Sequence, residues 1–193
     1  MSQDYKNIPL TIDIEREKLT FSKTPKLQVN SQTKRQKSFP REYTSPNFVK
    51  PFNQGVLGSC VGCSGKIIVT DEFSTEDLSA LWIYNKAKKY DVWEGENYSG
   101  TSIAGACQSL IKEGVCLEKF MPYVPKENVE PEFGAEQDAS KRKFTNFYAI
   151  GIDNIDQVKQ MIYDGKKLWT SFIVHEGFYD VYKGYINEKD YLK

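Results

Sequence analysis

The sequence predicts an α+β protein in which the helices come first along the chain and the strands follow. Three amphipathic patterns between residues 76 and 164 indicate helices, whereas the β-branched and aromatic run over 168–174 indicates a strand. Of its 193 residues, 39% are hydrophobic and 27% are charged, which is typical of a globular protein with a buried core. Helices and strands in separate parts of a chain predict an α+β arrangement rather than alternating βαβ units.

The composition predicts three parts. Residues 1–45 are polar and contain several prolines, so we expect an N-terminal arm with at most a short strand hairpin. Residues 46–125 are dense in apolar positions and form the predicted helical part, and residues 126–193 begin a strand-rich part. Residues 1–50 hold ten Lys or Arg against five Asp or Glu, which is too dilute a charge to predict nucleic acid as a partner.

The predicted helices have recognisable ends. A helix is expected near 76–90, with Ser74 and Asp77 as its capping pair, and it follows a first helix that begins at Cys60, within a glycine-spaced stretch. A further helix is expected over 102–113, opened by Thr101 and closed by Gly114.

The last predicted helix spans 155–164, with Asn154 as its cap and Gly165 as its stop signal. Its apolar positions predict an inward-facing side made of Val158, Met161 and Ile162.

Several functional classes are not favoured. No apolar run approaches the roughly 20 residues needed to cross a bilayer, and the first residues do not have a secretory pattern, so we expect the cytoplasm or a virus particle. In such a compartment the four cysteines are expected to be thiols. Their spacing differs from that of the usual zinc sites, so we expect no metal and no other cofactor. The cysteines are Cys60, Cys63, Cys107 and Cys116.

The segment Gln54-Gly-Val-Leu-Gly-Ser-Cys60 contains the elements of a thiol nucleophile site. A helix N-terminus lowers the pKa of a thiol, and Cys60 stands after a Gly-Ser turn where a helix is predicted to begin. The Cys60 backbone N–H and the Gln54 amide would supply two donors for an oxyanion.

Other interpretations of this segment are weaker. A phosphate-binding loop would need Gly at position 60 and Ser or Thr at position 67, where the chain has Cys60 and Ile67. A redox C-x-x-C formed by Cys60 and Cys63 lacks the expected βαβ surroundings. A buried cysteine at the start of an ordinary helix remains the plainest alternative.

The segment QGVLGSC resembles the sequence around the nucleophile of papain-like (C1-type) cysteine peptidases of the cathepsin-like, bacterial and viral branch. Three other stretches resemble the same family in the same order. They are LSALWIYNKAKKYD, YSGTSIAGACQSLIKEGVCLEKFMPY, and residues 158–186 with FYDVYKGYI at their end. The resemblance covers roughly residues 38–187 and implies a two-lobe fold, with the helical left lobe present and the β-rich right lobe incomplete.

The resemblance also implies roles for individual residues and a peptide or protein substrate. Cys60 would be the nucleophile, and Gln54 would donate to the oxyanion. Ser59, next to the nucleophile, would belong to the substrate-binding part. Ser99 and Gly100 would lie on the loop that pairs with an extended substrate. The chain departs from the family pattern at Val61-Gly62-Cys63, where an aromatic residue followed by Ala-Phe is common.

The catalytic histidine of the family is expected about 130–150 residues after the cysteine, beyond most of this chain. By the resemblance, the single histidine, His175, would fall near the wall of the substrate pocket and not at the base, and an exposed histidine at the end of the predicted strand is the plainest interpretation. We therefore expect a peptidase whose natural chain continues beyond Lys193. Two alternatives remain open. One is an inactive papain-like module that the N-terminal arm docks onto a larger assembly such as a virus particle, and the other is an enzyme completed by a second polypeptide.

Overall fold

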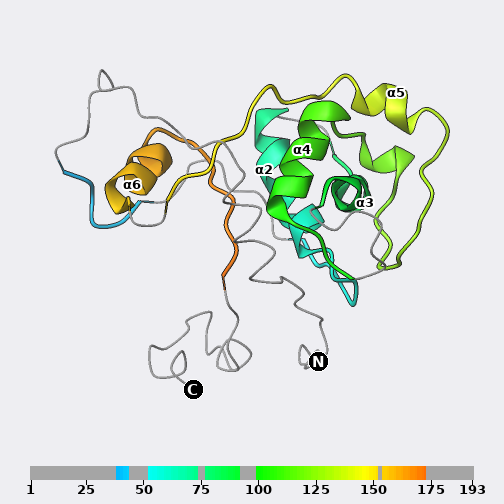
Figure 1. Cartoon of the computed structure of the whole chain (residues 1–193), viewed down its shortest axis with the longest axis horizontal. Helices are drawn as coiled ribbons and strands as arrows, with labels where there is room; N and C mark the ends of the chain where they lie inside the picture. Colours follow the sequence, from blue (N-terminus) through cyan, green and yellow to red (C-terminus); the bar gives the residue numbers. More distant parts are fainter. Residues whose placement is uncertain (1–37, 44–51, 74–76, 92–98, 152–153, 173–193) are drawn as a thin grey trace.

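A computed structural model describes residues 38–43, 52–73, 77–91, 99–151 and 154–172 of the chain (Figure 1). The described part is mainly helical, and one short antiparallel bridge joins Leu78 to Leu117. Among the described residues, no helix combines the length and hydropathy of a membrane span. The helical elements are α2 (Cys60–Glu72), α3 (Ala80–Ala87), η2 (Lys88–Tyr90), α4 (Ile103–Lys112), η3 (Glu118–Phe120), α5 (Ala135–Ala139) and α6 (Ile155–Tyr163).

Helix α3 lies at the centre of the core, between α2 and α4. Seven of its eight residues are buried, which explains why its sequence is apolar on nearly every side. Trp82 fills the centre, and its indole N–H donates to the carbonyl of Gly114 over 3.0 Å. The core extends beyond residue 125, because Ala135 and Ala139 of α5 belong to the same cluster.

The ends of the predicted helices are largely confirmed, and the capping residues explain the differences. Helix α3 begins at Ala80 because the Ser79 hydroxyl accepts a hydrogen bond from the Trp82 backbone N–H over 3.0 Å. The predicted cap Ser74 lies outside the described residues. Helix α4 is capped by Ser102 instead of Thr101, and Gly114 ends it with φ of 83°.

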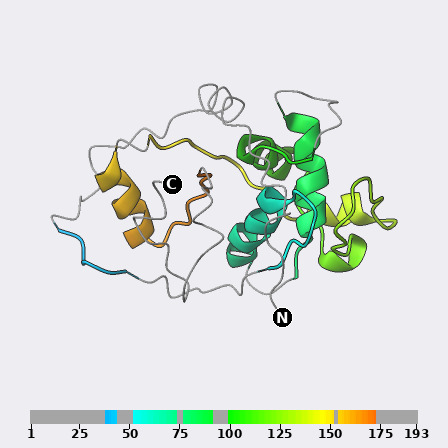
Figure 2. The ribbon, with the colours of Figure 1, turned by 90° about the horizontal axis from the view of Figure 1, so that it is seen from below.

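Helix α6 has the predicted cap, since the Asn154 side chain accepts a hydrogen bond from the Gln157 backbone N–H. The prediction that Val158, Met161 and Ile162 face inward is wrong for Ile162, which is 38% exposed, and holds only in part for Val158 and Met161, which are half-buried. Both views place α6 apart from the other helices, so its apolar side meets no core among the described residues (Figures 1 and 2). Tyr163 instead contacts the rings of Phe39 and Tyr43, at centroid distances of 6.1 and 5.8 Å.

The predicted strand over 168–174 is not found in its described residues, 168–172, and the other two lie outside. This segment returns to α2, where the Trp169 indole N–H donates to the Ser64 hydroxyl over 2.8 Å. An ion pair of 3.1 Å between Lys167 and Asp71 lies beside it. The β-rich lobe, the three-part division and most of the N-terminal arm stay predictions.

Helices α2 and α3 approach closely at Gly62. A Cβ atom at this position would press on the Ala80 carbonyl oxygen and lie 2.8 Å from the Tyr84 Cβ. Both neighbours belong to the buried centre of the fold and have little room to move. The glycine that departs from the family pattern is therefore required by the packing of α2 against α3.

We expect Gly62→Ala to lower the free energy of unfolding by about 1–3 kcal/mol, because overpacking outweighs the better helix propensity of alanine. Urea unfolding followed by circular dichroism measures the change. Gly151→Ala is the matched control, since a Cβ there would meet no atom within 4 Å. A Gly62→Ala protein as stable as this control would contradict the close approach.

Candidate active site

Cys60 is the first residue of α2, as the sequence predicts for a thiol nucleophile. Ser59 precedes the helix as its N-cap residue, and its side chain makes no capping hydrogen bond. Cys60 is half-buried, whereas Cys63, one turn later, is 5% exposed. Backbone N–H groups at a helix N-terminus carry positive partial charge, which favours negative charge nearby.

Gln54 begins the turn that leads to Cys60. Its side-chain amide donates to the Leu57 carbonyl over 3.1 Å, and the next residue, Gly55, has a positive φ of 63°. A primary amide has two N–H donors, so one remains after this bond to act elsewhere. The Gln54 side chain is therefore held within the turn that precedes α2, and its role as an oxyanion donor stays a prediction.

Tyr123 forms hydrogen bonds to both ends of the turn between Gln54 and Ser59. Its hydroxyl donates to the Gln54 carbonyl over 2.7 Å and lies 2.6 Å from the Ser59 hydroxyl. Because a carbonyl only accepts, the Tyr123 proton goes to Gln54 and the Ser59 hydroxyl donates to Tyr123. The Ser59 oxygen can then accept from the Cys63 thiol, whose sulfur lies 3.6 Å away. A directed chain of three hydrogen bonds runs from Cys63 to Gln54.

Burial determines the titration behaviour of the groups in this chain. Burial raises the pKa of the Cys63 thiol and outweighs the opposing influence of the nearby Ser59 and Tyr123 hydroxyls. Burial likewise raises the pKa of the Tyr123 hydroxyl. Both groups are therefore protonated at neutral pH, in agreement with their roles as donors.

The structure gives Ser59 a different environment from the predicted one. The side chain is completely buried, and its hydroxyl is engaged with Tyr123 and Cys63. It has no accessible surface with which to touch a substrate, so its visible role is to hold the turn before Cys60.

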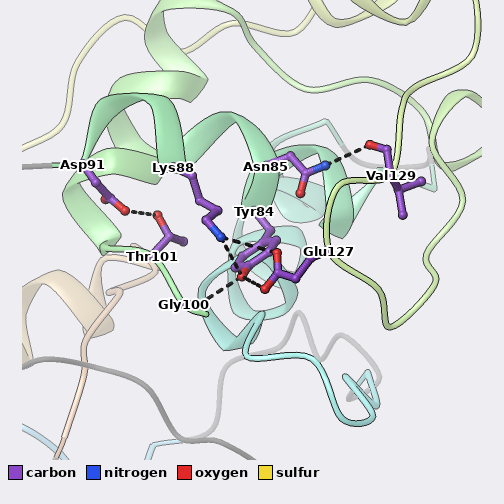
Figure 3. Close-up of polar contacts among 8 residues, drawn as sticks. All are labelled: Tyr84, Asn85, Lys88, Asp91, Gly100, Thr101, Glu127 and Val129. Carbon is purple, nitrogen blue, oxygen red and sulfur yellow. Dashed lines mark hydrogen bonds and ion pairs between the residues drawn. The ribbon is translucent and has the colours of Figure 1, made fainter. Parts of the chain in front are cut away.

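The predicted substrate loop at Ser99 and Gly100 is anchored to α3. The backbone N–H of Gly100 donates to the Tyr84 hydroxyl over 3.0 Å, and that hydroxyl donates to Glu127 over 2.7 Å (Figure 3). Gly100 is buried, with φ of 107°. A substrate strand would have to pair with its carbonyl, because the N–H already has a partner.

The loop is held on its other side by Asp91. Its carboxylate accepts hydrogen bonds from the Thr101 hydroxyl over 2.8 Å and from the Ser102 backbone N–H over 3.0 Å. The Ser102 hydroxyl also donates to it, and that hydroxyl in turn caps α4 by accepting from Gly105. Figure 3 shows the Asp91 and Tyr84 anchors on the two sides of Gly100 and Thr101.

Sequence reasoning missed Tyr123, Tyr84 and Asp91. Tyr123 lies 69 residues from Gln54, and no local pattern connects the two. The Pro-Tyr pair at 122–123 is a local signal, since it ends a stretch that resembles the family, but it does not indicate which residue Tyr123 contacts. His175 lies outside the described residues, and no group of three or more His, Cys, Asp or Glu in the described part is arranged to hold a metal ion.

A helical unit with a cysteine at the N-terminus of a packed helix, preceded by a glutamine turn, is the arrangement expected of papain-like cysteine peptidases. The comparison with solved structures confirms this resemblance. The chain is similar to xylellain, a cysteine protease from Xylella fastidiosa, with a TM-score of 0.52 and 27% identity. The match covers 61% of this chain and 52% of the xylellain chain, so the described similarity spans about half of that protein.

A weaker similarity was found to a structure that addresses the limited antibody cross-reactivity between the mite allergens Blo t 1 and Der p 1. Its TM-score is 0.45 and its identity 16%, and it covers 60% of this chain and 41% of the other. No protein-family model matches the chain, and no curated protein matches it in sequence.

Removing the Tyr123 hydroxyl tests the hydrogen-bond chain. We expect Tyr123→Phe to lower the free energy of unfolding by about 1–3 kcal/mol, because the fully buried Ser59 hydroxyl loses its acceptor. Thermal or urea unfolding measures this. Tyr148→Phe, at a tyrosine that is 53% exposed, should change stability by no more than about 0.5 kcal/mol. Equal effects of the two substitutions would refute the bridging role of Tyr123.

Proposed function

We propose that the chain carries the nucleophile half of a papain-like cysteine peptidase site, in which Cys60 attacks the carbonyl of a peptide bond. The observation that supports this most directly is the position of Cys60 as the first residue of α2, immediately after the turn that begins at Gln54. The 27% identity with xylellain, a cysteine protease, supports the same class of chemistry.

In the proposed reaction the Cys60 sulfur adds to the carbonyl carbon, and the carbonyl oxygen becomes an oxyanion. The Cys60 backbone N–H and the second N–H of Gln54 donate to that oxygen. Loss of the amine then forms an acyl-enzyme, which water hydrolyses. Ser99 and Gly100 would contact the substrate backbone, with the Gly100 carbonyl as the acceptor.

The amine that leaves must be protonated, and an imidazole does this in cysteine peptidases of this type. We propose that a histidine in a longer natural chain supplies it, in keeping with a match that covers only 52% of xylellain. An inactive module used for binding is the rival proposal, and the two differ in the reactivity of Cys60.

We expect iodoacetamide to alkylate Cys60 at pH 6 at least about tenfold faster than it alkylates N-acetylcysteine, because less than about 1% of an ordinary thiol is ionised there. Peptide mass spectrometry over time measures the rate. Cys63 and Cys116 are internal controls and should react slowly, since both are buried and burial raises both of their pKa values, that of Cys116 to about 12. A Cys60 rate equal to that of N-acetylcysteine at every pH would favour the inactive module.

Gln54→Ala tests the oxyanion role of Gln54 independently of the reactivity of Cys60. Alkylation by iodoacetamide forms no oxyanion, so its rate at Cys60 should change by less than about twofold. Hydrolysis of a dye-labelled peptide by the natural-length protein should lose about 10²–10³-fold in kcat. Gln137→Ala, at an exposed position of α5, is the matched control and should leave both rates unchanged. An unchanged kcat in Gln54→Ala would remove Gln54 from the oxyanion site.

A further inference from the structure

The first turn of α2 contains two cysteines on one side of the helix. Cys60 begins the helix, and the backbone N–H of Cys63 donates to the Ser59 carbonyl over 2.9 Å, which closes the turn between them. Residues three apart share a helix face, and their Cα atoms lie roughly 5 Å apart in ideal geometry. A disulfide spans Cα separations of about 4.4–6.8 Å, so this pair meets the distance requirement without unwinding the turn.

The two thiols are in different environments. Cys60 is half-buried at the helix end, whereas Cys63 is buried and its thiol points to the Ser59 hydroxyl, 3.6 Å away. Burial raises the pKa of Cys63, and the charge of the neighbouring Cys60 raises it further. Soluble reagents thus meet Cys60 first, while Cys63 is held protonated and close by.

We propose that Cys60 and Cys63 form a reversible disulfide that removes the nucleophile, so that a soluble thiol–disulfide couple regulates the site. This inference rests on the proposed function, because it assumes that Cys60 is the nucleophile. The usual family pattern has a phenylalanine at the position of Cys63, so the device belongs to this chain's own residues. It also gives the C-x-x-C spacing a role without requiring a redox fold around it.

The oxidant is a small disulfide, written RSSR. The Cys60 thiolate attacks one sulfur of RSSR, which forms a Cys60–SR bond and releases RS⁻. Cys63 then loses its proton to RS⁻ or to water and attacks the Cys60 sulfur. The Cys60–Cys63 bond forms and a second RS⁻ leaves, so two thiols are oxidised by two electrons and RSSR is reduced to two thiols. An excess of reduced thiol reverses both steps.

The other two cysteines do not offer an equivalent pair. Cys116 is completely buried, and burial raises its pKa to about 12, so it is a poor nucleophile for exchange. Cys107 lies on α4 and Cys116 after it, nine positions apart along the chain, and no single helical turn joins them. Trypsin cleavage after Lys66 and after Lys112 places the pair and each of the other two cysteines on separate peptides.

The test uses the 193-residue chain equilibrated with glutathione and glutathione disulfide at ratios from strongly reducing to strongly oxidising. We expect the peptide with both cysteines to lose two hydrogen masses, and alkylation of Cys60 to fall at least tenfold. Dithiothreitol should restore both. In Cys63→Ser, Cys60 should instead keep one glutathione, because the resolving thiol is absent. Circular dichroism shows whether this variant is folded.

Persistent glutathione on Cys60 of the unchanged chain, or a disulfide to Cys107 or Cys116, would overturn the proposal. So would an unmodified pair under the most oxidising ratio. These failures are distinct from failure of the proposed function. If Cys60 is alkylated rapidly in reducing buffer but no Cys60–Cys63 disulfide forms, the proposed peptidase function is retained and the proposed redox regulation is refuted. If Cys60 is as slow as N-acetylcysteine, the nucleophile itself is refuted.

Discussion

The close approach of α2 to α3 at Gly62 sets the position of everything around Cys60. Because this residue has no Cβ, the first turns of α2 lie directly on the Ala80 carbonyl and the Tyr84 side chain. Tyr84 then reaches through its hydroxyl to the Gly100 N–H. Through Tyr84, the segment that begins at Cys60 and the predicted substrate loop are both held on α3, which is itself buried on nearly every side.

Burying α3 so fully requires that its charged residue be compensated. Lys86 is 6% exposed, and its ammonium group contacts Glu113 at 2.6 Å and Glu136 at 3.1 Å and lies over the Trp82 ring. Burial alone would lower the pKa of Lys86, but the two carboxylates outweigh it and raise the pKa. Asp138 is compensated in a similar way. Burial alone would raise its pKa, but the hydrogen bond from the Leu117 N–H and the charge of Arg142 lower it. Charges in the core are therefore paired, as the cost of burying a lone charge demands.

The sequence predicted those features that depend on neighbours along the chain. The start of α2 at Cys60, the glycine end of α4 and the Asn154 cap of α6 follow from local hydrogen bonds, and local patterns indicate them correctly. The Tyr123 bridge could not be predicted in this way, since it joins residues 69 apart in sequence.

The error at α6 has a different cause. Periodicity shows which side of a helix is apolar, but it does not show whether a core exists for that side to contact. Ile162 is 38% exposed despite its place in the pattern. The same limit applies to Gly62: helix propensity alone marks a glycine within a helix as unfavourable, whereas the contact with α3 explains why no side chain fits there.

Gly62 and Cys63, which both differ from the usual family residues, have different roles although they are adjacent. Gly62 serves packing, whereas Cys63 serves the polar chain that ends at Gln54. In that chain Cys63 is the terminal donor, so the bonds from Ser59 to Tyr123 and from Tyr123 to Gln54 do not need its proton. The proposed Cys60–Cys63 disulfide would consequently change the Cys60 sulfur, the proposed nucleophile, while the turn that contains Gln54 keeps its hydrogen bonds. Such a disulfide alters the reactive sulfur and leaves the surrounding hydrogen bonds in place. Reduction would then restore the Cys60 thiol without a need to rebuild the turn.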